Sequence, residues 1–181
     1  MLNVQRNFKY MARVFLSLGS NLGDRLSNIQ QAVATLGMSD KINILKTSSF
    51  YETEPWGNKN QNWFVNAALA LDTDFQPHEL LKFCQNIEYQ LGRIRNQNEK
   101  WQERAIDIDI LMYDDMIMSQ DKSLIIPHPY MHLRAFVLVP MLEVKADLIH
   151  PVFNKTISDL YEELENPEDV FLYGTVMPRQ E

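Results

Sequence analysis

Residues Ala105-Ile106-Asp107-Ile108-Asp109-Ile110-Leu111 alternate between isoleucine and aspartate over their five central positions. Successive side chains of a β-strand point to opposite faces of its sheet, so the alternation predicts a strand whose three isoleucines face a core. Asp107 and Asp109 then share the other face, with their Cα atoms about 7 Å apart. This stretch therefore predicts a half-buried strand that carries two neighbouring carboxylates.

The two carboxylates predict a cation site. They can bind one cation, or two cations about 4 Å apart, whereas without a cation they repel each other. Oxygen ligands without a cysteine or histidine cluster favour Mg²⁺, which usually completes its coordination with water and phosphate oxygens. Arg93, Arg95 and Arg104 precede the strand, and guanidinium groups match phosphate oxygens. The pattern thus favours a magnesium–polyphosphate site, and a solvated strand face is the structural alternative.

The elements around this strand predict the fold. Asp24 is a suitable N-cap for a helix that ends near Gly37, and Pro77 is a suitable first residue for a helix closed by Gly92. The resulting order of strand, helix, strand, strand, helix, strand is the plan of a ferredoxin-like α+β sandwich, a mostly antiparallel sheet with helices packed on its faces. The other expected strands are 14–18, 42–53 and 64–71, and further helices are expected from 135 and over 156–164.

Composition limits the class of protein. The 181 residues carry a formal net charge of −7, which argues against a general nucleic-acid surface. There is no apolar run long enough for a membrane span, and the single Cys84 excludes an internal disulfide and favours a reducing compartment. We therefore expect a cytoplasmic monomer with one domain at 13–165, a flexible N-terminal extension at 1–12 and a C-terminal tail at 166–181.

A second group of residues fits recognition of a flat heterocycle. Asn66 is a polar residue in an apolar strand, close to Phe64, and a buried amide needs hydrogen-bond partners. A ring for stacking and an amide for edge hydrogen bonds suit a heterocycle, although a cross-strand hydrogen bond would also satisfy Asn66. Trp56 lies in a polar loop, where it covers a ligand about as often as it packs half-buried.

Two further motifs carry less information. The turn Gly19-Ser20-Asn21-Leu22-Gly23 lacks the Gly-Lys-Ser/Thr ending of a phosphate-binding P-loop, so a tight strand-to-helix turn is favoured. His128 lies between Pro127 and Pro129, which fix their own φ angles. A lone histidine is more often structural, but a rigid backbone on both sides suits a positioned phosphate ligand.

Together these motifs resemble a known family. Their order is that of the 6-hydroxymethyl-7,8-dihydropterin pyrophosphokinases, folate-pathway enzymes that transfer the terminal diphosphate of ATP to the pterin hydroxymethyl group and release AMP. The resemblance covers 14–151 and rests on the glycine turn, Ser49-Phe50-Tyr51-Glu52-Thr53, Asn66-Ala67-Ala68, Gly92-Arg93-Ile94-Arg95, the block from Arg104 to Leu111, and Pro127-His128-Pro129.

The resemblance implies roles for individual residues. Asp107 and Asp109 would bind two Mg²⁺ ions, and Arg93 and Arg104 would complete the catalytic group. The implied ATP contacts are Gln85, Glu88, Arg95, Trp101, Ile110, Lys122, His128 and Arg134. The implied pterin contacts are Thr53, Glu54, Trp56, Phe64, Asn66, Trp101 and Phe136. The sequence departs from the family pattern at Lys100, Gln102, Ile125 and Pro129.

Two other functions fit the same residues less completely. A different Mg²⁺-dependent phosphoryl or nucleotidyl transferase would share the aspartates and arginines but would not need Phe64, Asn66 and Trp101. A non-catalytic ferredoxin-like binding module would leave Asp107 and Asp109 as a solvated face. The fold alone does not decide between these functions.

Overall fold

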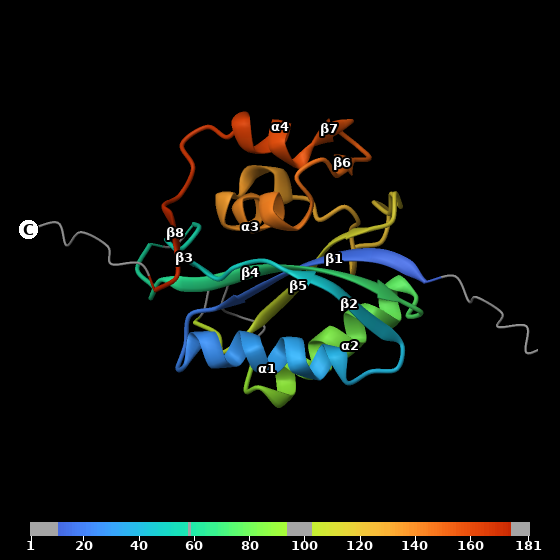
Figure 1. Ribbon diagram of the computed structural model, residues 1–181, viewed down its shortest axis with the longest axis horizontal. Helices are drawn as coiled ribbons and strands as arrows, with labels where there is room; N and C mark the ends of the chain where they lie inside the picture. The colour runs from blue at the N-terminus through green and yellow to red at the C-terminus, as the bar shows by residue number, and fades with distance from the viewer. Residues whose placement is uncertain (1–10, 58, 94–102, 175–181) are drawn as a thin grey trace, which may run out of the picture.

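The computed structural model describes residues 11–57, 59–93 and 103–174. It consists of a central sheet with helices on both faces (Figure 1). The first part of the chain forms β1 (Ala12–Ser20), α1 (Arg25–Gly37), β2 (Ile42–Thr47), β3 (Tyr51–Thr53), β4 (Phe64–Thr73), α2 (Pro77–Gln90) and β5 (Asp107–Tyr113). The second part forms the 3₁₀ turn η1 (Met131–Leu133), α3 (Ala135–Lys145), β6 (Ile149–His150), β7 (Lys155–Thr156), α4 (Ile157–Glu162) and β8 (Val170–Leu172).

The predicted fold class is confirmed, and so is the predicted order of elements, except that one expected strand forms two. The main sheet has the strand order β5-β1-β4-β3-β8, β2 also pairs with β4, and every pairing is antiparallel. Asp24 caps α1 as predicted, because its carboxylate accepts a hydrogen bond from the Ser27 N–H at 3.0 Å. Within the described residues, none of the helices is long and apolar enough to cross a membrane.

The stretch 42–53, predicted as one strand, forms two strands. Both β2 and β3 pair with β4, and the chain bends between them at Ser48. The Ser48 N–H donates to the Ala68 carbonyl, and the Ser48 hydroxyl accepts from the Ala68 N–H, each at 2.9 Å. A side-chain hydroxyl therefore replaces a backbone acceptor at the bend, which residue-type preferences do not reveal.

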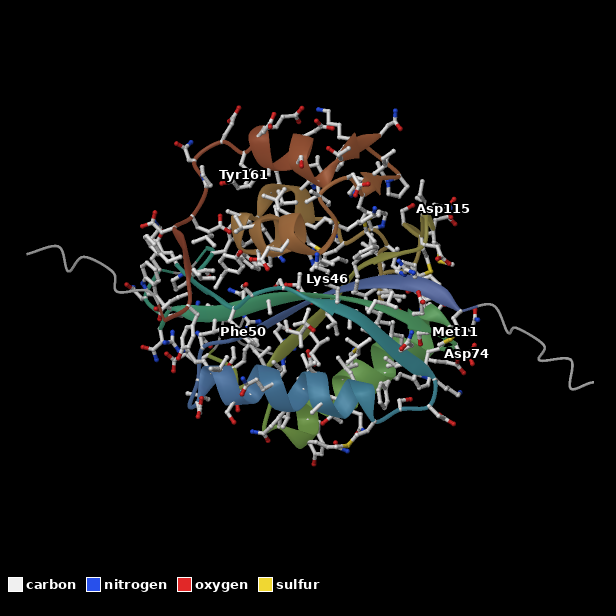
Figure 2. The ribbon with its side chains drawn as sticks, viewed as in Figure 1. Met11, Lys46, Phe50, Asp74, Asp115 and Tyr161 are labelled. Carbon is white, nitrogen blue, oxygen red and sulfur yellow. The ribbon has the colours of Figure 1, made fainter. Side chains whose placement is uncertain are left out.

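The sheet is buried on both faces. Val14, Leu16 and Leu18 of β1 pack towards α1 and α2, whereas Phe15 packs towards α3 and α4. Figure 2 shows side chains filling both layers, and the labelled Phe50 packs on the α1–α2 side. On β1 the core on the α3 side includes Phe15 but neither Ser17 nor Gly19, which line a cavity instead.

The sheet continues past the predicted domain end at residue 165. β8 lies within the stretch expected to be a tail, and it pairs with β3 through Thr53 and Val170. The ring of Phe171 also stacks on Trp63, with the ring centroids 6.0 Å apart. Residues 166–174 therefore belong to the fold. The sequence pattern missed them because three residues at a sheet edge carry no clear alternation.

We expect Asp24→Ala to lower the free energy of unfolding by about 1 kcal/mol, because the first turn of α1 loses its side-chain acceptor. Urea denaturation would measure this change. Asp40→Ala, an exposed substitution in the turn after α1, is the matched control and should change stability by less than about 0.5 kcal/mol. Equal destabilisation by the two variants would contradict this account.

Candidate functional site

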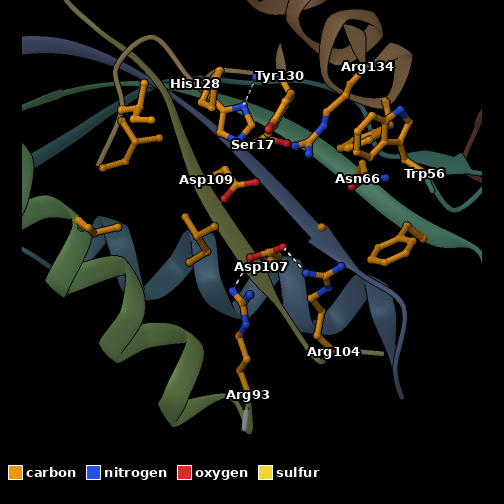
Figure 3. Close-up of a pocket in the computed structure, with 18 of the residues that line it drawn as sticks. Ser17, Trp56, Asn66, Arg93, Arg104, Asp107, Asp109, His128, Tyr130 and Arg134 are labelled. Atoms are coloured by element: carbon orange, nitrogen blue, oxygen red, sulfur yellow. Dashed lines mark hydrogen bonds and ion pairs between the residues drawn. The ribbon is translucent and has the colours of Figure 1, made fainter. Parts of the chain in front are cut away.

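The described residues line an open cavity of about 490 Å³ on the α3 side of the sheet. This volume lies within the range of small-molecule sites. Its walls come from β1, β3, the loop after β3, β4, α2, β5, the 121–134 connection and the start of α3, and Figure 3 labels ten of the lining residues. Most of the residues predicted for the site, which lie far apart in the sequence, therefore surround one space.

The aspartate strand is placed as its alternation predicts. Ile108 and Ile110 are buried in the core, while Asp107 and Asp109 line the cavity. The register of β1 against β5 puts Asp107 opposite Gly19 and Asp109 opposite Ser17. Burial raises the pKa of Asp109, and the neighbouring Asp107 raises it further because two like charges lie close together.

Two arginines neutralise Asp107. Arg93, just after α2, pairs with one oxygen of Asp107 and also with Glu88. The Nη1 of Arg104 donates to the other oxygen of Asp107 at 2.8 Å (Figure 3). The backbone of Arg104 is itself fixed by Asn21, because the Asn21 side-chain oxygen accepts from the Arg104 N–H at 2.8 Å. The turn Gly19–Gly23 thus fixes the position of Arg104, which the sequence of the turn does not reveal.

Glu88 lies behind the cavity wall. Its side chain is 2% exposed, and one oxygen accepts from the Ile108 N–H at 2.8 Å. The same carboxylate pairs with Arg93. The structure therefore places Glu88, expected to contact ATP, as a link between α2 and β5 rather than among the lining residues.

The opposite end of the cavity contains Asn66. Its side-chain NH₂ donates to the Thr53 hydroxyl at 2.7 Å, so the cross-strand alternative raised for this residue holds. Its oxygen lies over Gly19, where a Cβ atom would approach it to 2.5 Å. The absence of a side chain at Gly19 therefore leaves room for the Asn66 side chain, which reaches Thr53 on the other neighbouring strand.

An aromatic wall adjoins Asn66. The guanidinium of Arg134 lies 4.6 Å from the ring centroid of Trp56, 5.4 Å from that of Tyr130 and 5.5 Å from that of Phe136. Arg134 is 9% exposed, and its Nε has no hydrogen-bond partner among the described residues. A buried cation surrounded by rings, with an unused donor, is suited to an anionic ligand.

His128 is held at the edge of the cavity. Its backbone N–H donates at 2.8 Å to the carbonyl of Leu111, the residue at which β5 bulges away from its pairing with β1. Burial and the charge of Arg134 lower the pKa of His128 to about 4. Because Nδ1 accepts from the Tyr130 N–H at 3.2 Å, the neutral ring carries its proton on Nε2. His128 can therefore donate one hydrogen bond.

Most of the residues predicted for the site from the sequence line the same cavity. Residues predicted for the site that line the cavity are Thr53, Glu54, Trp56, Phe64, Asn66, Gln85, Arg93, Arg104, Asp107, Asp109, Ile110, Lys122, His128, Arg134 and Phe136. Arg95 and Trp101, and the departures Lys100 and Gln102, lie outside the described residues. Lining residues that sequence reasoning did not assign include Ser17, Gly19, Gln61, Ser123 and Tyr130. For Ser17 and Gly19, the missing information was the register of β1 against β5.

Comparisons with known proteins agree with one another. A family model described as 7,8-dihydro-6-hydroxymethylpterin-pyrophosphokinase matches residues 15–146. A Methylorubrum extorquens protein named 2-amino-4-hydroxy-6-hydroxymethyldihydropteridine pyrophosphokinase is 45% identical over 77% of this chain and 86% of its own length. An Aquifex aeolicus protein of the same name is 40% identical over 84% of this chain and 92% of its own length.

A solved structure has a similar fold. It is the Plasmodium falciparum HPPK-DHPS A437G with STZ-DHP, which superposes with a TM-score of 0.66 at 16% sequence identity. The match covers 90% of this chain and 47% of that one, so this chain spans about half of the Plasmodium chain. At this level of identity the likeness shows the fold alone.

We expect Gly19→Ala to displace the Asn66 side chain and break its hydrogen bond to Thr53, because the added Cβ would lie 2.5 Å from Asn66 Oδ1. Strain of this kind typically costs about 1–3 kcal/mol. Urea denaturation would measure the cost, and the NMR signals of the Asn66 side-chain NH₂ would report the displacement.

Gly37→Ala is the matched control for this substitution. Its added Cβ would meet only the end of the Ile44 side chain, at 3.2 Å, and that side chain can turn aside. We expect stability to change by less than about 1 kcal/mol, because alanine is also the better helix former. Unchanged Asn66 signals in Gly19→Ala would contradict the close approach.

Proposed function

Because the chain belongs to the 7,8-dihydro-6-hydroxymethylpterin-pyrophosphokinase family, it is a pyrophosphokinase of folate biosynthesis, and we propose that Asp107 and Asp109 hold the Mg²⁺ ions used in its reaction. The reaction transfers the diphosphate of ATP to the hydroxymethyl group of 6-hydroxymethyl-7,8-dihydropterin. ATP is therefore a co-substrate, and the alternatives of another transferase class or a non-catalytic module are set aside.

One observation supports our assignment of the two substrates to the cavity. Its walls carry carboxylates and cations at the β5 end and an amide with aromatic rings at the β3–β4 end. We assign the ATP phosphates to the first end, near Asp107, Asp109 and Lys122. We assign the pterin ring to the second end, where Asn66 can bond to its edge and Phe64 and Phe136 can stack on it.

The proposed metal ligands fit Mg²⁺. Asp107 and Asp109 supply only oxygen donors, and among the described residues no group of three or more His, Cys, Asp or Glu could hold a metal. Such a sparse set suits Mg²⁺, which takes water and phosphate oxygens for the rest of its coordination. Burial raises the pKa of Asp109 and repulsion by Asp107 raises it further, and a bound cation would favour the charged carboxylate against both effects. When bound, Mg²⁺ would neutralise phosphate charge and lower the pKa of the attacking hydroxyl.

The chain's own residues contribute positioning and positive charge. Diphosphate transfer spreads charge over the phosphate oxygens, so its transition state is stabilised mainly by aligned reactants and nearby cations. Arg93 and Arg104 lie beside Asp107, within reach of phosphates that arrive there. Arg134 supplies a buried cation between the two ends, and neutral His128 can donate from Nε2. The pterin oxygen attacks the β-phosphorus, so no side-chain nucleophile is needed.

We also propose a monomeric enzyme in a reducing compartment such as the cytoplasm. The single cysteine of the sequence, Cys84, supports the second point, because it cannot form an internal disulfide. The thiol is buried in α2, and burial raises its pKa to about 12, so it is a packing residue rather than a reactive thiol.

The reaction is tested by incubating the protein with ATP, Mg²⁺ and 6-hydroxymethyl-7,8-dihydropterin and following the products by ³¹P NMR. We expect pterin-dependent AMP and a pterin diphosphate ester. Formation of ADP instead would mean ordinary phosphoryl transfer and would overturn the assignment.

Asp109→Asn should lower kcat by about a hundredfold or more, because a metal ion contributes several kcal/mol of charge stabilisation. It should not lower the free energy of unfolding, because it removes a buried charge next to Asp107. Asp107→Asn should show a similar loss of kcat. AMP formation and urea denaturation would measure the two quantities.

Asp115→Asn is the control for these two variants. It replaces an exposed aspartate in the turn after β5, and it should leave kcat unchanged. Near-normal kcat in both Asp107→Asn and Asp109→Asn would exclude these residues as metal ligands.

Treatment with a chelator should abolish AMP formation, and added Mg²⁺ should restore it, because the aspartate pair would lack its cation. The dependence of rate on free Mg²⁺ at fixed ATP would then report whether more than one ion is needed. A rate that saturates once ATP is fully complexed with Mg²⁺ would argue against the second ion.

A further inference from the structure

The segment that ends in β8 passes along the cavity end to which we assign the pterin. Val170 lies opposite Thr53 in the pairing of β8 with β3, and the Thr53 hydroxyl accepts the hydrogen bond from Asn66. Farther along, the Tyr173 N–H donates to the Phe50 carbonyl at 2.8 Å. We call residues 168–172 the C-terminal strap. The pairing of the strap with β3 brings its first two residues to the rim of the cavity.

The strap bonds to two separate cavity walls. The Phe136 N–H donates to Glu168 Oε1 at 3.0 Å, and the Glu54 N–H donates to the Asp169 carbonyl at 3.0 Å. Phe136 is the second residue of α3 and Glu54 follows β3, and both residues line the cavity. Two adjacent residues of the strap therefore fix the spacing between the aromatic wall and the wall that carries Thr53 and Trp56.

The start of α3 depends on an acceptor from elsewhere in the chain. Its N-cap residue is Arg134, whose side chain has only donors and makes no capping hydrogen bond. The free N–H groups of a first turn favour an anion, and the half-buried Glu168 carboxylate supplies one. Burial lowers the pKa of Arg134, and the negative charge of Glu168, together with those of Asp109 and Asp107, opposes this lowering. Glu168 thus stabilises both the helix start and the neighbouring cation.

We propose that Glu168 is a positioning residue for pterin binding, acting through the backbone of Phe136, and that the C-terminal strap holds the pterin end of the cavity at its working width. This inference rests on the proposed placement of the pterin beside Phe136 and Asn66. Glu168 does not itself need to touch a substrate. It sets the position of a ring that does. At the phosphate end, the two oxygens of Asp107 are bonded to Arg93 and Arg104 and not to the strap.

The test compares Glu168→Ala with Glu168→Gln. Alanine removes the acceptor, whereas glutamine keeps a carbonyl oxygen that can accept from the Phe136 N–H. We expect Glu168→Ala to raise KM for the pterin by about tenfold, as loss of a hydrogen bond to a charged group implies, with KM for ATP within about twofold of wild type. Glu168→Gln should recover most of the pterin affinity.

Glu165→Ala is the matched control, an exposed glutamate three residues before Glu168. It should leave both KM values and kcat unchanged. An unchanged pterin KM in Glu168→Ala would overturn the proposal. A parallel rise of both KM values would also overturn it, because a purely structural residue would weaken the whole site.

A binding measurement separates this proposal from the proposed function. Calorimetric titration of 6-hydroxymethylpterin, with an ATP analogue whose α–β bridging oxygen is a methylene, needs no turnover. Pterin binding by wild type that weakens in Glu168→Ala would support the strap even if no AMP were formed. Equal pterin binding by the two proteins would overturn the strap whether or not AMP is formed, and absence of pterin binding by wild type would overturn the pterin placement on which the strap depends.

Discussion

The antiparallel register of β1 between β4 and β5 is the constraint on which the site depends. Gly19 faces Asn66 on one side and Asp107 on the other, so one residue without a side chain aligns the polar groups of both neighbouring strands. A slip of one residue in either pairing would turn a neighbouring strand's apolar residues towards the cavity and its polar residues towards the core. Leu16, Leu18 and Ile108 are buried between the sheet and the α1–α2 layer. Their burial opposes such a slip, because the slip would expose these side chains. The hydrophobic core thus positions the polar groups of the site.

The second feature is the local balance of charge. The whole chain is acidic, yet the cavity gathers Arg93, Arg104 and Arg134 around two aspartates. Each arginine is held by a different part of the fold: Arg93 by Glu88 at the end of α2, Arg104 by Asn21 of the glycine turn, and Arg134 by the aromatic wall. Arg93 and Arg104 share Asp107 as a partner, whereas the Nε of Arg134 has no hydrogen-bond partner among the described residues, so the three cations together can face a ligand that carries several negative charges.

Local patterns in the sequence predicted much of this arrangement. The alternation around Asp107 and Asp109 gave both faces of β5, and Asp24 and Pro77 correctly marked the starts of two helices. The features that were missed depend on contacts between distant residues. The division of 42–53 arises from the pairing of Ser48 with Ala68, the burial of Glu88 from its bond to Ile108, and β8 from an edge that only β3 provides. The pattern of residues within one segment indicates whether it forms a helix or a strand and where that element ends. It does not indicate which distant segment the element packs against or pairs with.

The pairing of β3 with β8 also bears on how the molecule is made. Thr53 and Val170 are partners across more than a hundred residues, and β3 and β8 are farther apart in sequence than any other pair of neighbouring strands in the main sheet. Bringing such distant segments together costs chain entropy before any contact between them forms. This entropy cost slows folding. On a ribosome, the strands from β1 to β5 can assemble while the edge beside β3 still lacks its partner. That edge would expose unpaired backbone groups to other nascent chains until residue 172 has left the exit tunnel.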